Sequence, residues 1–198
     1  MKIFANILII LSIGIACNHS GASKDLDDSV YLSNGDSIAS IAQKVLMSNV
    51  VQAIETRGVT GAVAFCNERA IPLTDSVSES TGCIIWRLSN RNRNPANALI
   101  TAEDSLAFQK AEILMKDSLA DKKHFVAREH GAVYYYKAIT IGMPACLKCH
   151  GSKSADISPE TLQVIDEKSP ADKATGYHMG EIRGLWKIKM NINEKAAL

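Results

Sequence analysis

Apolar residues recur at helical spacing in the first third of the chain. They fall on one face of an α-helix, at positions 38, 41, 42, 45, 46, 50, 53 and 54. Asp36 or Ser37 can cap the start of this helix, and Gly58 can end it. Residues 59–66 are small and apolar. We interpret them as a second helix that ends near Pro72, with a strand as the alternative.

The pattern changes to that of β-strands in four later segments. Residues 82–88 are rich in β-branched and aromatic side chains, which is typical of a strand. Residues 122–128 and 132–141 flank His130-Gly131 and predict a β-hairpin. Residues 184–192 alternate between two sets of side chains, as a half-buried strand does.

Turn and capping residues divide the remaining segments. Residues 91–98 contain Asn94-Pro95 and predict a loop. Thr101 and Asp104 match an acidic capping box that opens a helix to about residue 118, and Ser158-Pro159 starts another helix. Helices come first and strands follow without regular alternation. This order predicts an α+β fold with an antiparallel sheet and flanking helices.

Length and charge narrow the function classes. The chain has 198 residues, of which 46% are hydrophobic, which suits one domain with a real core. Its 22 Lys and Arg residues nearly balance 21 Asp and Glu residues. This balance argues against binding of nucleic acid through overall charge and against an acidic solvating chain.

The N-terminal segment predicts export. Lys2 precedes an apolar run over residues 3–16, and Ala16 is followed by Cys17. The arrangement resembles a bacterial lipoprotein signal. It implies a signal peptide over 1–16, a lipid anchor on Cys17 and a periplasmic, membrane-anchored protein. The alternatives are a simple secretory signal cut nearby and an uncleaved anchor.

The residues after the signal peptide differ in composition from the signal peptide and from the domain that follows. Residues 17–36 are rich in Ser, Gly, Asn and Asp, and we expect a flexible tether there. The folded domain is then expected over residues 37–198.

The segment Cys146-Leu147-Lys148-Cys149-His150 has the spacing of a c-type haem attachment site. Two thiols three positions apart can each add to one vinyl group of the porphyrin. The histidine after the second thiol is then placed under the iron as its proximal ligand.

Three alternatives for this segment have less support. A thioredoxin-like C-x-x-C favours a βαβ context and a helix N-terminus, and neither is evident in the sequence. A structural zinc site needs a second Cys or His pair at similar spacing, and there is none. A plain disulfide leaves His150 without a role.

One haem leaves a second axial position, either open or filled by a side chain. The side chains that can fill it are Cys66, Cys83, His124, His130, His178, Met143 and Met179. For each of them, ordinary packing in the core or exposure in a turn is the competing interpretation.

Several segments together resemble the haem-binding DUF3365 family, also called Tll0287-like proteins. The matching stretches are residues 62–66 (AVAFC), 87–89 (RLS), 93–97 (RNPAN), 146–151 (CLKCHG) and positions between 170 and 184. The resemblance implies a PAS-like α+β fold with one covalent haem c. It also implies that Cys66 is the second axial ligand, opposite His150.

Two further observations concern the haem site that this resemblance implies. Cys83 is an additional cysteine, and a Cys66–Cys83 disulfide is an alternative in an oxidising compartment. Arginine side chains suit the haem propionates, because the guanidinium fork matches a carboxylate. The candidates are Arg87, Arg91, Arg93 and Arg183, with a solvated surface position as the alternative for Arg91.

Three functions follow from a tethered monohaem module. The first is periplasmic electron transfer to a redox partner protein, and the second is redox or gas sensing through a signalling partner. The sequence contains no kinase, methyl-accepting or transmembrane relay segment, which favours electron transfer. A third, enzymatic function would need a distal acid–base pair, and none is recognisable.

Overall fold

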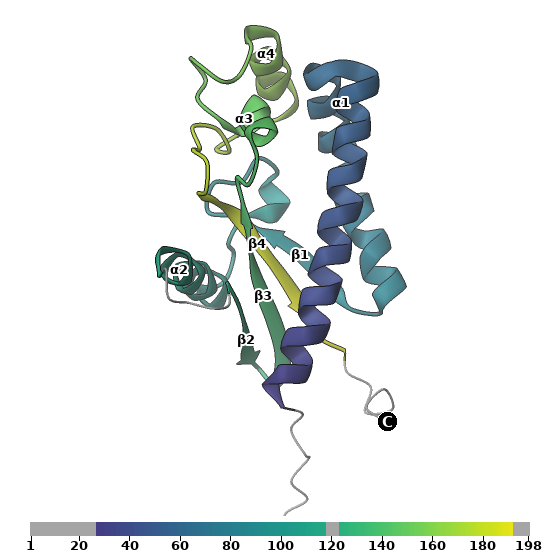
Figure 1. Cartoon of the computed structure of the whole chain (residues 1–198), viewed down its shortest axis with the longest axis vertical. Coiled ribbons are helices and arrows are strands. Elements are labelled where there is room, and N and C mark those ends of the chain that lie inside the picture. Colours follow the sequence, from purple (N-terminus) through teal and green to yellow (C-terminus); the bar gives the residue numbers. More distant parts are fainter. Residues whose placement is uncertain (1–26, 118–122, 192–198) are drawn as a thin grey trace, which may run out of the picture.

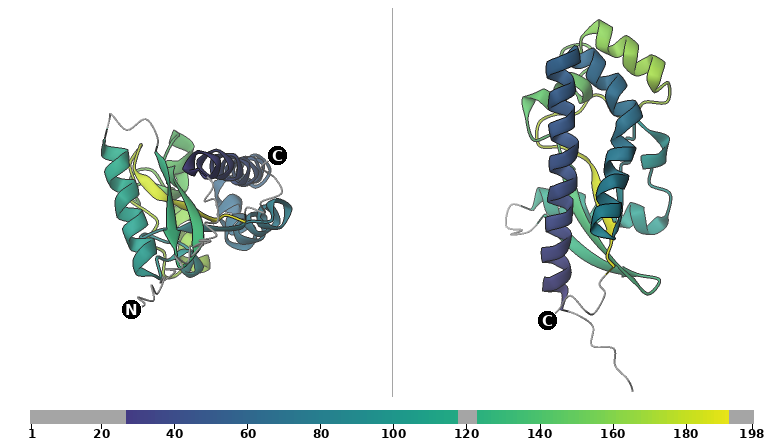
Figure 2. Two further views of the ribbon diagram at one scale, coloured as in Figure 1. Left: turned by 90° about the horizontal axis from the view of Figure 1, so that it is seen from below. Right: turned by 90° about the vertical axis from the view of Figure 1, so that its right-hand side faces the viewer.

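A four-stranded antiparallel sheet lies between two layers of helices (Figures 1 and 2). The computed structural model describes residues 27–117 and 123–191. Its elements are, in chain order, α1 (Asp28–Thr81), β1 (Ile84–Leu88), the 3-10 helix η1 (Pro95–Asn97), α2 (Ala102–Lys116), β2 (His124–Glu129), β3 (Ala132–Thr140), α3 (Pro144–His150), α4 (Pro159–Lys168) and β4 (Ile182–Lys189).

The strands lie in the order β1-β4-β3-β2, and every neighbouring pair is antiparallel. His130 and Gly131 form the turn between β2 and β3, with φ values of 50° and 78°. This confirms the predicted hairpin and the α+β class. β4 joins the two halves of the sheet, because it pairs with β1 on one side and with β3 on the other.

Helix α1 folds back on itself and covers one face of the sheet (Figure 2, right). Its first arm, residues 28–57, and its second arm, residues 59–81, meet at Gly58, which has φ 67° and ψ 176°. This backbone region is open essentially only to glycine. The prediction that Gly58 ends the first helix is therefore confirmed, and the chain reversal depends on this residue.

The prediction of a flexible tether is wrong for residues 28–36, because they belong to the first arm of α1. The helix begins after Asp27, whose carboxylate accepts hydrogen bonds from the backbone N–H and the hydroxyl of Ser29. Tyr31 and Leu32 pack against the core of the sheet. Local capping signals predict that the helix starts at Asp36 or Ser37. Because the preceding residues also pack on the sheet, the helix begins earlier in the chain, at Asp28.

The second arm also runs further than predicted, through Pro72 to Thr81. Pro72 lies on the exposed side of the helix, while Ala70, Thr74 and Val77 are buried. A proline inside a helix removes one backbone hydrogen bond and costs about 3 kcal/mol. The buried face of the arm offsets this cost, and Gly82 then ends the helix in the left-handed conformation.

Helix α2 covers the other face of the sheet. The predicted capping box is confirmed, because the Thr101 hydroxyl accepts from the Asp104 N–H at 3.1 Å, and an Asp104 carboxylate oxygen accepts from the Thr101 N–H at 3.4 Å. The same carboxylate pairs with Lys187 of β4 at 2.7 Å. Glu129 lies 3.4 Å from the same ammonium group, so a buried ionic cluster ties α2 to the sheet.

Helix α4 begins at Pro159 after the Ser158 cap, as predicted, and packs beside α1 at the Gly58 end of the molecule. The hydroxyl groups of Thr60 and Thr161 lie 3.3 Å apart across this contact. The predicted signal peptide, Cys17 and the remainder of the tether, residues 18–26, lie outside the described residues. Among the residues described, no helix is both long and apolar enough to cross a membrane.

The close contact between Gly35 and Tyr135 gives a stability prediction. A Cβ atom at Gly35 would lie 2.2 Å from Cγ of Tyr135, whose ring is fully buried. The Tyr135 hydroxyl is held by His124 at 2.7 Å and by Asp36 at 3.1 Å, so the ring cannot easily move. We expect Gly35→Ala to lower the free energy of unfolding by about 1–3 kcal/mol, measured by urea denaturation.

The matched control is Gly142→Ala, since a Cβ there would meet only Thr140, at ordinary distances of 3.6 Å from its hydroxyl and 4.0 Å from its carbonyl oxygen. The control should unfold within about 0.5 kcal/mol of the unmodified chain. If the Gly35→Ala variant were as stable as the unmodified chain, the close contact between Gly35 and the Tyr135 ring would be contradicted.

Candidate functional site

A cavity of about 690 Å³ lies between the two arms of α1, the sheet and α3. Its volume falls within the range of cofactor sites, about 300–1,000 Å³. The seven site residues proposed from the sequence all line it: Cys66, Arg87, Arg93, Cys146, Cys149, His150 and Arg183. They come from five separate parts of the chain, and only the fold brings them together.

Helix α3 explains how the C-x-x-C-H spacing brings its two thiols and its imidazole together. Pro144 opens the helix, and the Gly151 N–H closes its last turn on the Leu147 carbonyl at 2.9 Å. Positions three and four apart share a helix face, so Cys146, Cys149 and His150 point to one side. The sequence did not predict this helix, whose seven residues carry no periodic signal.

The presence of α3 corrects one argument made from the sequence. Cys146 does lie in the first turn of a helix, as a thioredoxin-like motif would require. The other half of that argument holds, because strands β1 to β4 all pair antiparallel and no βαβ unit surrounds the motif in the described part of the chain. Within the residues described, no group of three or more His, Cys, Asp or Glu side chains is arranged to hold a metal ion.

His150 is held by the loop that precedes β4. Its Nδ1 lies 2.8 Å from the Ala174 carbonyl oxygen and 3.3 Å from Nε of Arg183. Burial, followed by the positive charges of Arg183 and Arg93, lowers the pKa of His150 well below its usual value. The imidazole is therefore neutral, which is the form that binds metals.

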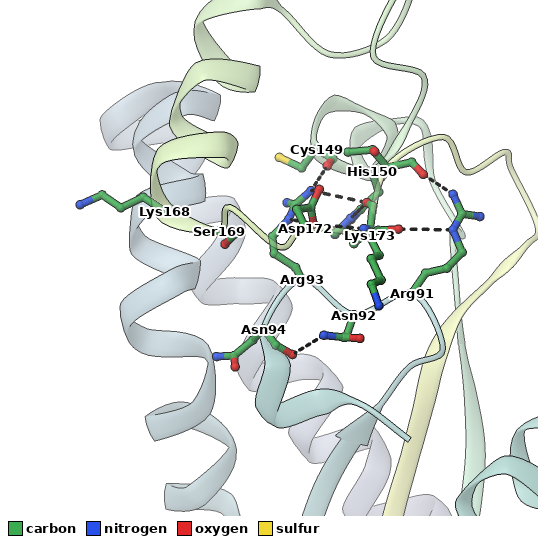
Figure 3. A network of polar contacts seen from close by, with 12 residues as sticks. Arg91, Asn92, Arg93, Asn94, Cys149, His150, Lys168, Ser169, Asp172 and Lys173 are labelled. Carbon is green, nitrogen blue, oxygen red and sulfur yellow. Dashed lines mark hydrogen bonds and ion pairs between the residues drawn. The ribbon is translucent and has the colours of Figure 1, made fainter. Parts of the chain in front are cut away.

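Arg93 is bonded to the C-x-x-C-H motif rather than free in the cavity. Its Nε donates to the Asp172 carboxylate at 2.9 Å, and a terminal nitrogen donates to the Cys149 carbonyl at 2.7 Å (Figure 3). Its side chain is 16% exposed and that of Asp172 is 3% exposed. The guanidinium therefore already has a carboxylate partner within the chain.

Arg87 and Arg183 differ from Arg93 in this respect. Neither forms an ion pair with any carboxylate in the described part of the chain. Burial lowers the pKa of Arg183 to about 10, so its guanidinium remains charged at neutral pH. Burial also lowers the pKa of Arg87, which Cys66 partly opposes. Two cations without carboxylate partners thus face the cavity.

Arg91 does not line the cavity. Its guanidinium lies 3.8 Å from the ring centroid of Tyr177 and donates to the Thr175 carbonyl. Tyr177 is buried, and its ring meets that of His150 edge to face at a centroid distance of 6.3 Å. Arg91 therefore packs on the tyrosine that contacts the histidine, which neither of its sequence interpretations anticipated.

The other two cysteines of the described residues, Cys66 and Cys83, are both unpaired, but their surroundings differ. Cys66 lies on the second arm of α1 and lines the cavity. Burial raises the pKa of its thiol, while the charges of Arg87 and Arg93 act in the opposite direction. Cys83 is buried in the apolar core between α1 and the sheet. The alternative Cys66–Cys83 disulfide is not formed.

The other candidate axial ligands also differ in whether they line the cavity. His124 is bonded to the Tyr135 hydroxyl, while His130 and His178 are exposed beside Glu103 and Glu181. None of these three histidines lines the cavity, and neither does Met179. Met143 does line it, and so does Met47, which sequence reasoning missed because it lies within the predicted helix, beside the apolar positions of its buried face.

The fold and the site together define a class: an α+β domain with a C-x-x-C-H helix at an apolar, cationic cavity. A family model described as Tll0287-like matches residues 27–191. The chain belongs to the Tll0287-like family, as the resemblance in its sequence indicated.

One solved structure shares this fold. It is described as the crystal structure of the cyanobacterial heme-protein Tll0287, and it matches with a TM-score of 0.62. The two sequences are 20% identical, and the match covers 83% of this chain and 96% of that chain. No curated protein matches the sequence.

Proposed function

We propose that this chain is an exported, monohaem c-type protein of periplasmic electron transfer. Cys146 and Cys149 attach the haem, and His150 is the proximal ligand. The observation that carries the proposal is the meeting of C-x-x-C-H, Cys66 and three arginines in one cavity. The heme-protein described for the structural neighbour supports the same cofactor.

The chemistry of the cavity suits a haem in three respects. Much of its wall is apolar, with residues such as Leu46, Val50, Ile54 and Ile139. The charged residues that line it are all basic: Lys44, Arg87, Arg93, Lys137 and Arg183. His150 is neutral, with Nδ1 bonded to a carbonyl. An apolar macrocycle with two carboxylates and a metal that binds imidazole matches this surface.

Among the arginines, we assign Arg87 and Arg183 to the propionates. Both face the cavity without a carboxylate partner among the described residues, so a propionate would supply the missing negative charge. Arg93 is a weaker candidate than its sequence position suggests, because its guanidinium already has a carboxylate partner in Asp172.

We further propose that Cys66 is the second axial ligand. The thiol lies in the cavity with Arg87 and Arg93 nearby, and these charges favour the thiolate that a metal requires. A bound haem supplies one-electron iron redox chemistry. The negative charge of a Cys66 thiolate stabilises the ferric state, so a low reduction potential is expected.

Export and anchoring remain part of this proposal. The N-terminal sequence supports a lipoprotein signal with Cys17 as the anchor, and the partner would be a periplasmic redox protein. The PAS-like architecture inferred from the family resemblance agrees with an antiparallel sheet flanked by helices. The near-neutral charge of the chain implies that docking relies on a local patch.

The second candidate function is a haem-based redox or gas sensor that signals through a partner protein. The raised pKa of the Cys66 thiol favours it, because a thiol that tends to hold its proton can leave the iron on reduction. An opened position could then bind a diatomic gas.

The first test is covalent attachment. The full chain, expressed with a bacterial cytochrome c maturation system, should give a haem-stained band on a denaturing gel and a mass increased by one haem. The Cys146→Ser/Cys149→Ser double variant should lose both signals, because each thioether needs a thiol. Cys83→Ser is the matched control and should keep them, since Cys83 lies in the core. A wild-type chain without haem would refute the proposal.

The second test is the axial ligand. Cys66→Ala should lose the low-spin ferric thiolate spectrum and shift the midpoint potential upward, because the ligand charge that stabilises ferric iron is removed. The measurements are the visible spectrum and a spectroelectrochemical titration. Cys83→Ala should behave as the unmodified protein does. An unchanged spectrum in Cys66→Ala would contradict the ligand assignment.

The third test separates the two functions. For electron transfer we expect slow binding of CO to the reduced protein, limited by dissociation of a retained ligand. Fast, concentration-dependent binding, followed by stopped-flow absorbance, would favour the sensor instead. In that case, Cys66→Ala should not accelerate the reaction, because the site is already open.

A further inference from the structure

The loop between α4 and β4 is bonded to the end of the attachment motif. The Tyr177 N–H donates to the His150 carbonyl at 2.9 Å, and the Gly176 N–H donates to the Gly151 carbonyl at 2.6 Å. Asp172 lies in this loop, and its side chain is almost completely buried, with 3% exposed. Neither the sequence motif nor the proposed function gives this carboxylate a role.

The first connection from Asp172 leads to the second attachment cysteine. The two carboxylate oxygens accept from Nε and a terminal nitrogen of Arg93 at 2.9 and 3.4 Å. The same terminal nitrogen donates to the Cys149 carbonyl at 2.7 Å (Figure 3). The ion pair therefore aims the guanidinium at the backbone of the motif, and a bidentate pair fixes its direction.

The second connection leads to the proximal histidine. The Ala174 N–H donates to the Asp172 carboxylate at 3.0 Å, and this turn directs the Ala174 carbonyl toward Nδ1 of His150 at 2.8 Å. Arg93 also reaches that carbonyl, at 3.4 Å. Asp172 is thus one hydrogen bond away from the residue whose carbonyl orients the imidazole.

The contacts of Nδ1 pose a choice between two tautomers. The Ala174 carbonyl can only accept, so its contact requires a proton on Nδ1. Nε of Arg183, at 3.3 Å, can only donate, so a bond from it requires Nδ1 without a proton. A neutral imidazole cannot satisfy both. The shorter contact to Ala174 selects the tautomer with Nδ1–H, which leaves the Nε2 lone pair free for a metal.

We propose that Asp172 is a positioning residue of the haem site: through Arg93 it fixes the Cys149 backbone, and through Ala174 it sets the His150 tautomer that leaves Nε2 free to ligate iron. This inference rests on the proposed haem attachment. It predicts an effect on the iron as well as on stability, because a hydrogen bond from Nδ1–H makes the imidazole a stronger electron donor and stabilises ferric iron.

The test is Asp172→Asn in the full chain carrying its haem. The variant keeps the shape of the side chain but places an amide where Arg93 needs a carboxylate. We expect the midpoint potential to shift upward, because the His150–Ala174 bond weakens, and the fraction of chains carrying covalent haem to fall. Arg93→Lys should shift the potential in the same direction, since lysine keeps the charge but loses the fork. If Asp172→Asn does not accumulate as folded protein, Arg93→Lys decides the question.

Asp104→Asn is the matched control. Asp104 and Lys187 form another buried ion pair, at 2.7 Å with side chains 7% and 11% exposed, on the opposite face of the sheet. This variant should lose stability to urea without any shift in potential, which separates a positioning role from a merely structural one.

The outcomes distinguish the two proposals. A wild-type chain without covalent haem would refute the proposed function. A haem-loaded Asp172→Asn variant with the wild-type potential and haem content would overturn the role of Asp172 and leave haem attachment intact. The role would also be overturned by an equal shift in potential in Asp104→Asn.

Discussion

The structure depends on the reversal of α1 at Gly58. Only a residue without a Cβ adopts the backbone angles found there, and the reversal lays two helical arms over one face of the sheet. The cavity lies between these two arms, the sheet and α3, all of which supply lining residues. Cys66 faces the C-x-x-C-H helix for the same reason: it lies on the second arm, eight residues after the turn.

Charge is distributed unevenly between the two faces of the sheet. On the α2 face, Lys187 is neutralised by Asp104 and Glu129 within the core. On the cavity face, Arg87 and Arg183 have no such partner in the described part of the chain. Buried cations without a direct ion-pair partner are costly. A surface of this kind favours an anionic ligand, and a haem with two propionates has the required charge.

The predicted elements matched the structure where local signals and tertiary packing agree. Three local signals are confirmed, because each depends only on hydrogen bonds or backbone angles of residues close in sequence. They are the Thr101–Asp104 capping box, the His130-Gly131 turn and the Ser158-Pro159 helix start. The errors lie where packing extends an element beyond its local signals. The helix runs through Pro72 and begins at Asp28 because buried contacts along α1 outweigh a proline and a polar composition.

The sequence alone determined the candidate motif and the attachment chemistry proposed for it, because the C-x-x-C-H spacing is local and places its three side chains on one helix face. It also determined the family, through motifs spread over the chain. Only the tertiary structure decided the individual roles: Arg93 pairs with Asp172, 79 residues away, while Arg87 and Arg183 face the cavity. Such contacts join distant segments, and their geometry arises from the packing of the whole domain rather than from any local pattern.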